Sequence, residues 1–130
     1  MSGWIWVDGA IVLAIHEEQL AEHGGLAGTR DEGMLASALM RPRNLEGYGD
    51  PDLYDLAAAY AFGIARNHPF IDGNKRTAFA VAITFLELNG FELEIDDAAQ
   101  VLTMLGLAAG SVSEPDFAAW LRAHCRKRQP

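Results

Sequence analysis

The chain has 130 residues, a size that fits one domain whose core can form without metal or disulfide support. Half of the residues are hydrophobic and 22% are charged, as in soluble globular proteins, and no run of about twenty apolar residues predicts a membrane-spanning helix. The formal net charge of −8 and the sequence pI of about 4.8 disfavour a general nucleic-acid-binding role, because an acidic surface repels phosphate backbones.

The cysteine content and the N-terminal residues indicate a cytoplasmic protein. Cys125 is the only cysteine, so no intrachain disulfide can form, which fits a reducing compartment. Residues 1–6 lack the basic start and apolar core of a signal peptide. The tail at 122–130 is basic, and we interpret it as a charged helix end that complements the helix dipole, with a contact to a protein partner as the alternative.

Two helices are predicted in the first third of the chain. The first is capped by Asp8, runs over about 9–22 and is closed by the glycine pair 24–25. The second covers about 31–40 and should stop before Pro42, because the residue before a proline is disfavoured in the α conformation.

A connector and a third helix follow. Residues 42–50 have the composition of turns throughout, so we expect no regular structure there. Asp50 and Pro51 form an N-cap with a proline in the first turn, and apolar residues at helical spacing continue to about Asn67. The third helix should end there, because the next residue precedes Pro69.

The most apolar segment of the chain is predicted to be a central helix. Residues 78–88 are apolar on nearly every side, and a helix of that kind lies inside a domain. It should continue to Asn89 and stop at Gly90.

The last third of the chain first alternates between apolar and polar residues and then returns to helical patterns. Residues 91–95 predict a brief strand or an extended connector, and the pair 96–97 caps a helix that continues to about Ala109. A capping box at 113–116 opens the last helix. The whole pattern predicts an all-α bundle of about six helices in a single domain, with a core over about residues 7–121 and a basic tail.

Residues 68–77 (H-P-F-I-D-G-N-K-R-T) place an imidazole, a carboxylate, a carboxamide, two cations and a hydroxyl directly before the central helix. Unpaired backbone N–H groups and the positive end of the helix dipole gather at such a helix start, which favours phosphate binding. Lys75 and Arg76 would add donors, Asp72 is the kind of ligand that a phosphate-bound magnesium uses, and His68 can accept a proton. Singly, each residue also fits a turn, a cap or a surface charge. Together they favour a phosphate site with a base at its rim.

Two other nucleotide-binding motifs and a zinc-protease motif do not fit the sequence. No Gly-Lys pair exists for a phosphate-binding loop of the G-x-x-x-x-G-K type, and a helix rather than a strand precedes the glycine at position 73, against a dinucleotide fold. His16 opens a pattern like that of zinc proteases, but Leu20 stands where the second histidine is needed. We therefore interpret His16 as a structural histidine packed near the site, with a supporting role left open.

The segment from His68 to Arg76 resembles the motif H-x-F-x-[DE]-G-N-K/G-R of the Fic/Doc superfamily at every fixed position. Its continuation to Ala78 looks like the Doc (death-on-curing) branch, the toxins of toxin–antitoxin pairs, and Arg66 matches that branch as well. Upstream, residues 13–16 and 23–28 look like the first helix of the family and its closing glycine turn. The likeness spans roughly residues 7–121.

The resemblance implies a toxin that uses ATP and Mg²⁺ to transfer the γ-phosphoryl group to a hydroxyl of a translation factor of the elongation factor Tu class. An antitoxin would hold its inhibitory segment near the active-site groove, where the family has a flap that corresponds to residues 42–50. Members with a glycine in place of Lys75 and a second arginine in place of Phe79 mostly transfer AMP, whereas Gly73 departs from the best-studied Doc motif. AMP transfer and a catalytically silent binding module remain the alternatives.

The same resemblance assigns roles to seven residues. His68 would be the general base, and Asp72 would hold magnesium. Charge on the transferring group would be stabilised by Lys75 and Arg76. The predicted phosphate or nucleotide contacts are Arg66, Gly73, Asn74, Lys75 and Arg76, with the Asn74 side chain included in the anion site.

Overall fold

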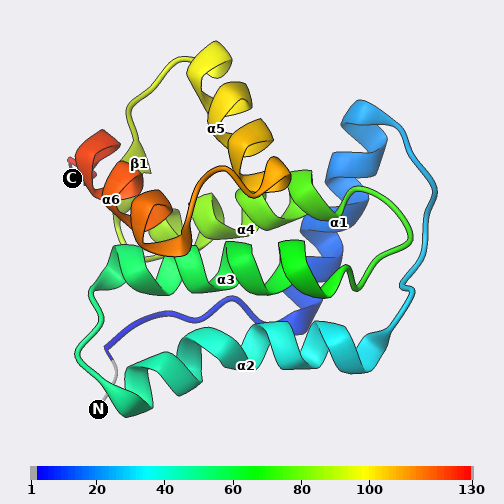
Figure 1. The fold of residues 1–130 in the computed structure, drawn as a ribbon, viewed down its shortest axis with the longest axis horizontal. Helices are drawn as coiled ribbons and strands as arrows, with labels where there is room; N and C mark the ends of the chain where they lie inside the picture. Colours follow the sequence, from blue (N-terminus) through cyan, green and yellow to red (C-terminus); the bar gives the residue numbers. More distant parts are fainter. Residues whose placement is uncertain (1–2, 130) are drawn as a thin grey trace.

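A computed structural model describes residues 3–129, and within this range six helices enclose one core beside a two-stranded sheet (Figure 1). The prediction of an all-α single domain is confirmed in its fold class. The elements are α1 (Gly9–His23), α2 (Glu32–Tyr48), α3 (Leu53–Asn67), α4 (Asn74–Leu88), β1 (Phe91–Leu93), α5 (Asp97–Ala109), α6 (Glu114–His124) and β2 (Cys125–Lys127). Among the described residues, no helix is long and apolar enough to cross a membrane.

Helices α3 and α4 form the centre of the domain. In α3 every residue from Leu56 to Ile64 is buried, because the helix packs against α2, α4 and α6. In α4 the buried hydrophobic residues are Ala78, Phe79, Val81, Ala82, Phe85 and Leu86. The predicted central helix is therefore confirmed. The short loop between α3 and α4 carries His68 and Asp72, and the other polar residues that the sequence singles out begin α4.

Five of the six described helices start at side-chain caps, as predicted, with one correction. Asp8, Asp31, Asp96 and Ser113 each accept a backbone N–H three residues further on. Helix α3 is instead capped by Asp52, two residues after the predicted Asp50. The reason is a reciprocal capping box, in which Asp52 and Asp55 each accept the backbone N–H of the other.

Helix α2 contradicts the prediction that it stops near residue 40. It continues to Tyr48 with Pro42 inside it, so residues 42–50 are largely helical and only residues 49–52 connect α2 to α3. Pro42 lacks the N–H for a helical hydrogen bond, which normally disfavours this position. Packing offsets that cost, because Pro42 is buried and Arg41 pairs with Glu114 of α6 through both of its terminal nitrogens.

The basic tail is also different from its predicted form. Helix α6 ends at His124, and residues 125–127 form β2, which pairs antiparallel with β1. Arg126 forms ion pairs with Glu92 and Glu94, so its charge is matched across the sheet. The predicted charged helix end is confirmed for Arg122, which lies in the last turn of α6. It is wrong for residues 125–127, since local charge alone does not reveal pairing with a strand more than thirty residues away. The brief strand predicted within 91–95 is confirmed as β1.

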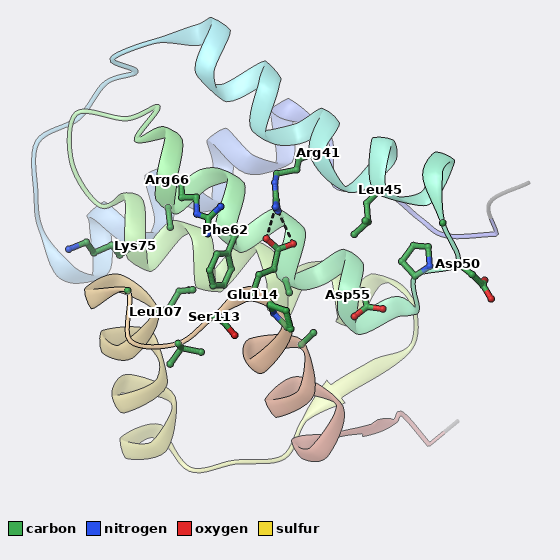
Figure 2. A pocket seen from close by; sticks show the side chains of 18 residues that line it. Arg41, Leu45, Asp50, Asp55, Phe62, Arg66, Lys75, Leu107, Ser113 and Glu114 are labelled. Atoms are coloured by element: carbon green, nitrogen blue, oxygen red, sulfur yellow. Dashed lines mark hydrogen bonds and ion pairs between the residues drawn. The ribbon is translucent and has the colours of Figure 1, made fainter.

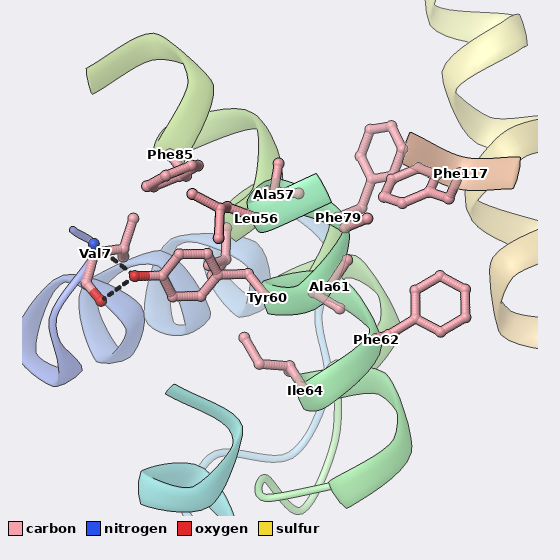
Figure 3. Packing of buried hydrophobic residues seen from close by; sticks show 14 of the residues in the cluster. Val7, Leu56, Ala57, Tyr60, Ala61, Phe62, Ile64, Phe79, Phe85 and Phe117 are labelled. Atoms are coloured by element: carbon pink, nitrogen blue, oxygen red, sulfur yellow. Dashed lines mark hydrogen bonds between the residues drawn. The ribbon is translucent and has the colours of Figure 1, made fainter. Parts of the chain in front are cut away.

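The core is tied to the N-terminal segment by the buried hydroxyl of Tyr60 (Figure 3). This hydroxyl accepts the backbone N–H of Val7 at 3.0 Å and lies 3.2 Å from the Val7 carbonyl, to which it donates. We expect Tyr60→Phe to lower the free energy of unfolding by about 1–3 kcal/mol, because two buried backbone groups lose their partner. Urea denaturation measures this loss. The matched variant Tyr48→Phe, at a side chain that is 91% exposed, should leave stability unchanged. Equal stability of both variants and the wild type would contradict this role of Tyr60.

Candidate active site

The loop of residues 68–73 carries the polar cluster from the end of α3 to the start of α4. His68 caps the C-terminus of α3 in the left-handed conformation, with φ 49° and ψ 54°, and it is the one non-glycine residue with positive φ in the described range. Its N–H still bonds to the Ile64 carbonyl at 3.1 Å. The chain therefore leaves the helix at the histidine, as the following Pro69 predicts.

The amide side chain of Asn74 shapes this loop from inside. It is only 4% exposed, its Oδ1 accepts the Phe70 N–H at 2.9 Å, and its Nδ2 donates to the Phe70 carbonyl at 2.9 Å. The same Nδ2 lies 3.2 Å from Nδ1 of His68. Both side-chain N–H groups are thus paired in this structure, and the phosphate contact predicted for Asn74 stays a prediction.

His16 supports the loop from α1. The ring is buried, its Nε2 lies 2.8 Å from the Asp72 carbonyl, and it stacks on Phe70 with ring centroids 3.8 Å apart. These contacts confirm the interpretation of His16 as a structural histidine next to the site. It holds the backbone of the loop rather than reaching into the pocket.

Asp72 is held so that its carboxylate stays charged. One oxygen accepts the N–H of Leu26 at 3.0 Å and the other that of Gly73 at 2.8 Å. These backbone hydrogen bonds, with smaller contributions from Arg76 and His16, lower the pKa of Asp72 below its ordinary value of 3.8. The carboxylate is therefore ionised at neutral pH.

An ionised carboxylate with unused lone pairs suits Mg²⁺, which takes one or two protein carboxylates and completes its shell with phosphate oxygens and water. No group of three or more potential metal ligands occurs among the described residues. A magnesium ion at Asp72 would therefore depend on the phosphates that it bridges, which fits the residues present.

Helix α4 begins without a side-chain cap, unlike the other five helices, which start at an aspartate or serine. Its N-cap is Gly73 with φ 75°, a conformation that favours glycine. A Cβ there would meet Leu20 at 3.4 Å. The first backbone N–H groups of α4 are left without a side-chain acceptor, and together with the helix dipole they favour an anion.

The pocket in front of this helix start has a volume of about 330 Å³. Ile71 and the hydrophobic side chains Met104 and Leu105 of α5 line it together with the motif. Five predicted side chains and Gly73 therefore meet in one pocket, whose motif residues are His68, Asp72, Gly73, Asn74, Lys75 and Arg76. Arg76 also donates to the Gly24 carbonyl at 3.1 Å, which anchors it near the end of α1.

Arg66 lies outside this pocket. It lines a larger groove of about 960 Å³ that runs beside α3, and its guanidinium lies over the Phe62 ring at 5.2 Å (Figure 2). Lys75 lines both cavities and so connects them. The middle of the groove is crossed by the Arg41–Glu114 pair, which is drawn with dashed lines in Figure 2. Arg66 thus shares the larger groove with Lys75 but does not line the pocket where the other predicted phosphate contacts meet.

The sequence analysis missed Arg30, which holds the loop from outside. Its Nε donates to the His68 carbonyl at 2.8 Å and its Nη2 to the Asn67 carbonyl at 2.9 Å. The backbone N–H groups of Arg30 and Asp31 both bond to the Pro69 carbonyl. A cation on the last carbonyls of α3 also complements the helix dipole. The local sequence gave no signal beyond an arginine before an N-cap, because its partners are 37 and 38 positions away.

The fold and the site define a class of protein. Residues 6–86 match the Fic/DOC family model, and the chain belongs to this family.

Two curated relatives narrow the comparison. Toxin Doc of Mycolicibacterium smegmatis is 47% identical over 77 residues, which are 56% of this chain, and the match spans only 58% of that protein. Protein kinase doc of Escherichia phage P1 is 33% identical over 113 residues, which are 85% of this chain and 88% of that protein.

Arg30→Ala should loosen the loop and lower the free energy of unfolding by about 1 kcal/mol, because two carbonyls at the end of α3 lose a charged donor. The N–H of Ile71, which bonds to the Gly28 carbonyl in the same loop pairing, should exchange faster with solvent. Hydrogen exchange followed by NMR measures this. Arg30→Lys keeps the charge without the planar fork, so it should give an intermediate rate. Exchange at the wild-type rate in Arg30→Ala would show that Arg30 does not hold the loop.

Proposed function

We propose that this chain is the toxin of a toxin–antitoxin pair and that it transfers the γ-phosphoryl group of ATP to a protein hydroxyl. The observation that carries the proposal is the uncapped start of α4, which faces a pocket lined by Asp72, Lys75 and Arg76 with His68 at its edge. The two relatives, one named as a toxin and the other as a protein kinase, support the same reaction.

Each side chain has a role in this reaction. Backbone N–H groups at the start of α4 would bind phosphate oxygens, and Lys75 and Arg76 would stabilise charge on the transferring group. Asp72 would hold magnesium, which supplies charge neutralisation on the phosphates. His68 would take the proton from the target hydroxyl while that oxygen bonds to the γ-phosphorus and ADP leaves with the electron pair of the broken bond. Arg66 would assist only from the adjoining groove.

Two residues of the chain, Lys75 and Phe79, favour phosphoryl transfer over AMP transfer. Lys75 fills the place of a glycine in the AMP-transferring pattern and adds a charge at the pocket. Phe79, where that pattern has its second arginine, is buried against the rings of Phe117 and Trp120. No cation from that position can reach the phosphates, so the nucleotide would lack one contact on which AMP transfer depends in the family.

The larger groove is the proposed place of a protein partner. It leads from Lys75 along α3 to Asp50 and Pro51, and so borders the segment that corresponds to the family's flap. We propose that an inhibitory segment of an antitoxin lies there and blocks the target or the nucleotide. The target would be a translation factor of the elongation factor Tu class in the cytoplasm. Direct binding of nucleic acid is not part of the proposal, since the net charge is −8.

The phosphate that moves can be identified with labelled ATP. The protein is incubated with a bacterial extract and ATP labelled at the α or the γ position. We expect label on a protein target only from the γ position. Label from the α position would show nucleotidyl transfer, and label from neither would favour a silent binding module. Lys75→Gly should lose γ transfer, because it removes a charge from the transition state and opens space beneath the phosphates.

Growth arrest should depend on the imidazole of His68. Expression of the wild type should stop bacterial growth, whereas His68→Ala should be tolerated, because a general base contributes about 10²–10⁴-fold in rate. Plating on inducing medium separates the two. The matched variant His23→Ala removes an imidazole outside the pocket and should stay toxic. Equal toxicity of the wild type and His68→Ala would mean that His68 is not the base or that binding alone causes harm.

A further inference from the structure

The side-chain amide of Asn74 has only one orientation that satisfies its neighbours. Oδ1 accepts the Phe70 N–H and Nδ2 donates to the Phe70 carbonyl, both at 2.9 Å. Turning the amide over would place N–H against N–H and oxygen against oxygen. Because Asn74 is 4% exposed, solvent cannot compensate that loss. The nitrogen facing His68 is therefore identified by its hydrogen-bond partners.

This orientation decides which nitrogen of His68 carries the proton. The second N–H of the Asn74 amide faces Nδ1 of His68 at 3.2 Å. An amide N–H can only donate, so Nδ1 must accept with its lone pair. A neutral imidazole has one protonated and one accepting nitrogen. Neutral His68 in this geometry therefore carries its proton on Nε2.

We propose that Asn74 is a positioning residue that holds His68 as the Nε2–H tautomer in the free protein, and that this hydrogen bond must break before His68 can accept a proton. The second part rests on the proposed phosphoryl transfer, whereas the first does not.

The reason lies in the lone pairs of the ring. At rest, the Nδ1 lone pair is covered by the Asn74 N–H, and Nε2 presents a donor. A target hydroxyl needs a free ring lone pair. Nε2 supplies one only after the ring proton has moved to Nδ1, and Nδ1 supplies one only after the ring has turned away. Either change ends the bond to Asn74. After the proton has moved, a protonated Nδ1 would face an N–H group, and after the ring has turned, Nδ1 no longer lies beside the amide.

The proton balance of the reaction is then complete. The hydroxyl oxygen of the target forms its bond to the γ-phosphorus as the bond from that phosphorus to the bridging oxygen breaks. The electron pair of the broken bond leaves with ADP. The hydroxyl proton moves to the ring nitrogen that release from Asn74 has exposed. The free protein therefore contains a complete site whose base is masked until the imidazole is released.

The tautomer can be read directly from the ¹⁵N chemical shifts of the imidazoles. Protein with ¹⁵N-labelled histidine is recorded without nucleotide at a pH where the rings are neutral, and the His68 signals are assigned by their loss in His68→Gln. We expect Nδ1 of His68 in the range of an unprotonated nitrogen and Nε2 in that of a protonated one. His124 is an internal control with the opposite result, because its Nδ1 lies 2.8 Å from the Trp120 carbonyl, which can only accept.

The variant Asn74→Asp tests whether Asn74 sets this state. The carboxylate can still accept the Phe70 N–H, but it turns an acceptor toward His68. Nδ1 of His68 should then become protonated, while His124 should not change. A merely structural role of Asn74 would not reverse the tautomer. If circular dichroism shows that the variant is unfolded, the wild-type spectrum decides alone.

Two results would overturn the proposal. One is a wild-type His68 with a protonated Nδ1. The other is an averaged pair of signals like that of His23, whose side chain is 42% exposed. Neither result depends on catalysis. The spectrum can therefore contradict the proposed tautomer without bearing on phosphoryl transfer, which the labelled-ATP assay tests by itself. A predicted tautomer without phosphoryl transfer would remove the proposed function and leave the role of Asn74 intact.

Discussion

The candidate site depends on one buried amide. The two hydrogen bonds between Asn74 and the Phe70 backbone close the loop between α3 and α4, and the same side chain reaches His68. Without this closure, neither the imidazole nor the carboxylate of Asp72 would have a defined place in front of α4. The amide is buried, so its hydrogen bonds are costly to break and the loop is correspondingly well defined.

Three other parts of the chain hold the loop around this amide. His16 of α1 bonds to the Asp72 carbonyl and stacks on Phe70, and Arg30 binds the carbonyls at the end of α3. The N–H of Leu26 binds the Asp72 carboxylate. The segment between α1 and α2 thus holds the motif loop through Leu26 and Arg30. Its contacts leave the first turn of α4 open, which is the feature that an anionic ligand needs.

The two cavities differ in their lining and in the ligands that they suit. The small pocket gathers the charged motif and suits phosphates, whereas the larger groove is lined by apolar residues of α3, α5 and α6 and by charged residues that include the Arg41–Glu114 pair. Lys75 borders both. A partner lying in the groove would therefore come within reach of the group that distinguishes the two chemistries of the family. Arg66 lines this larger groove and not the small pocket, so the phosphate contact predicted for it stays a prediction.

The sequence by itself determined the class of fold, the position of the central helix and the residues of the motif loop. These are local properties, because a helix that is apolar on all sides must be buried, and aspartate or serine at an N-cap indicates where a helix begins. Only the tertiary structure decided three other matters. Pro42 lies inside α2 because packing and the Arg41 pair offset its cost, the tail becomes β2 because β1 supplies its partner, and Asn74 turns inward because Phe70 is there to bind it. For Pro42 and the tail, the deciding partner lies far along the chain, where no local pattern of residues encodes the contact. For Asn74 the partner is only four residues away, but the residue types alone do not show whether the side chain turns inward or toward a ligand.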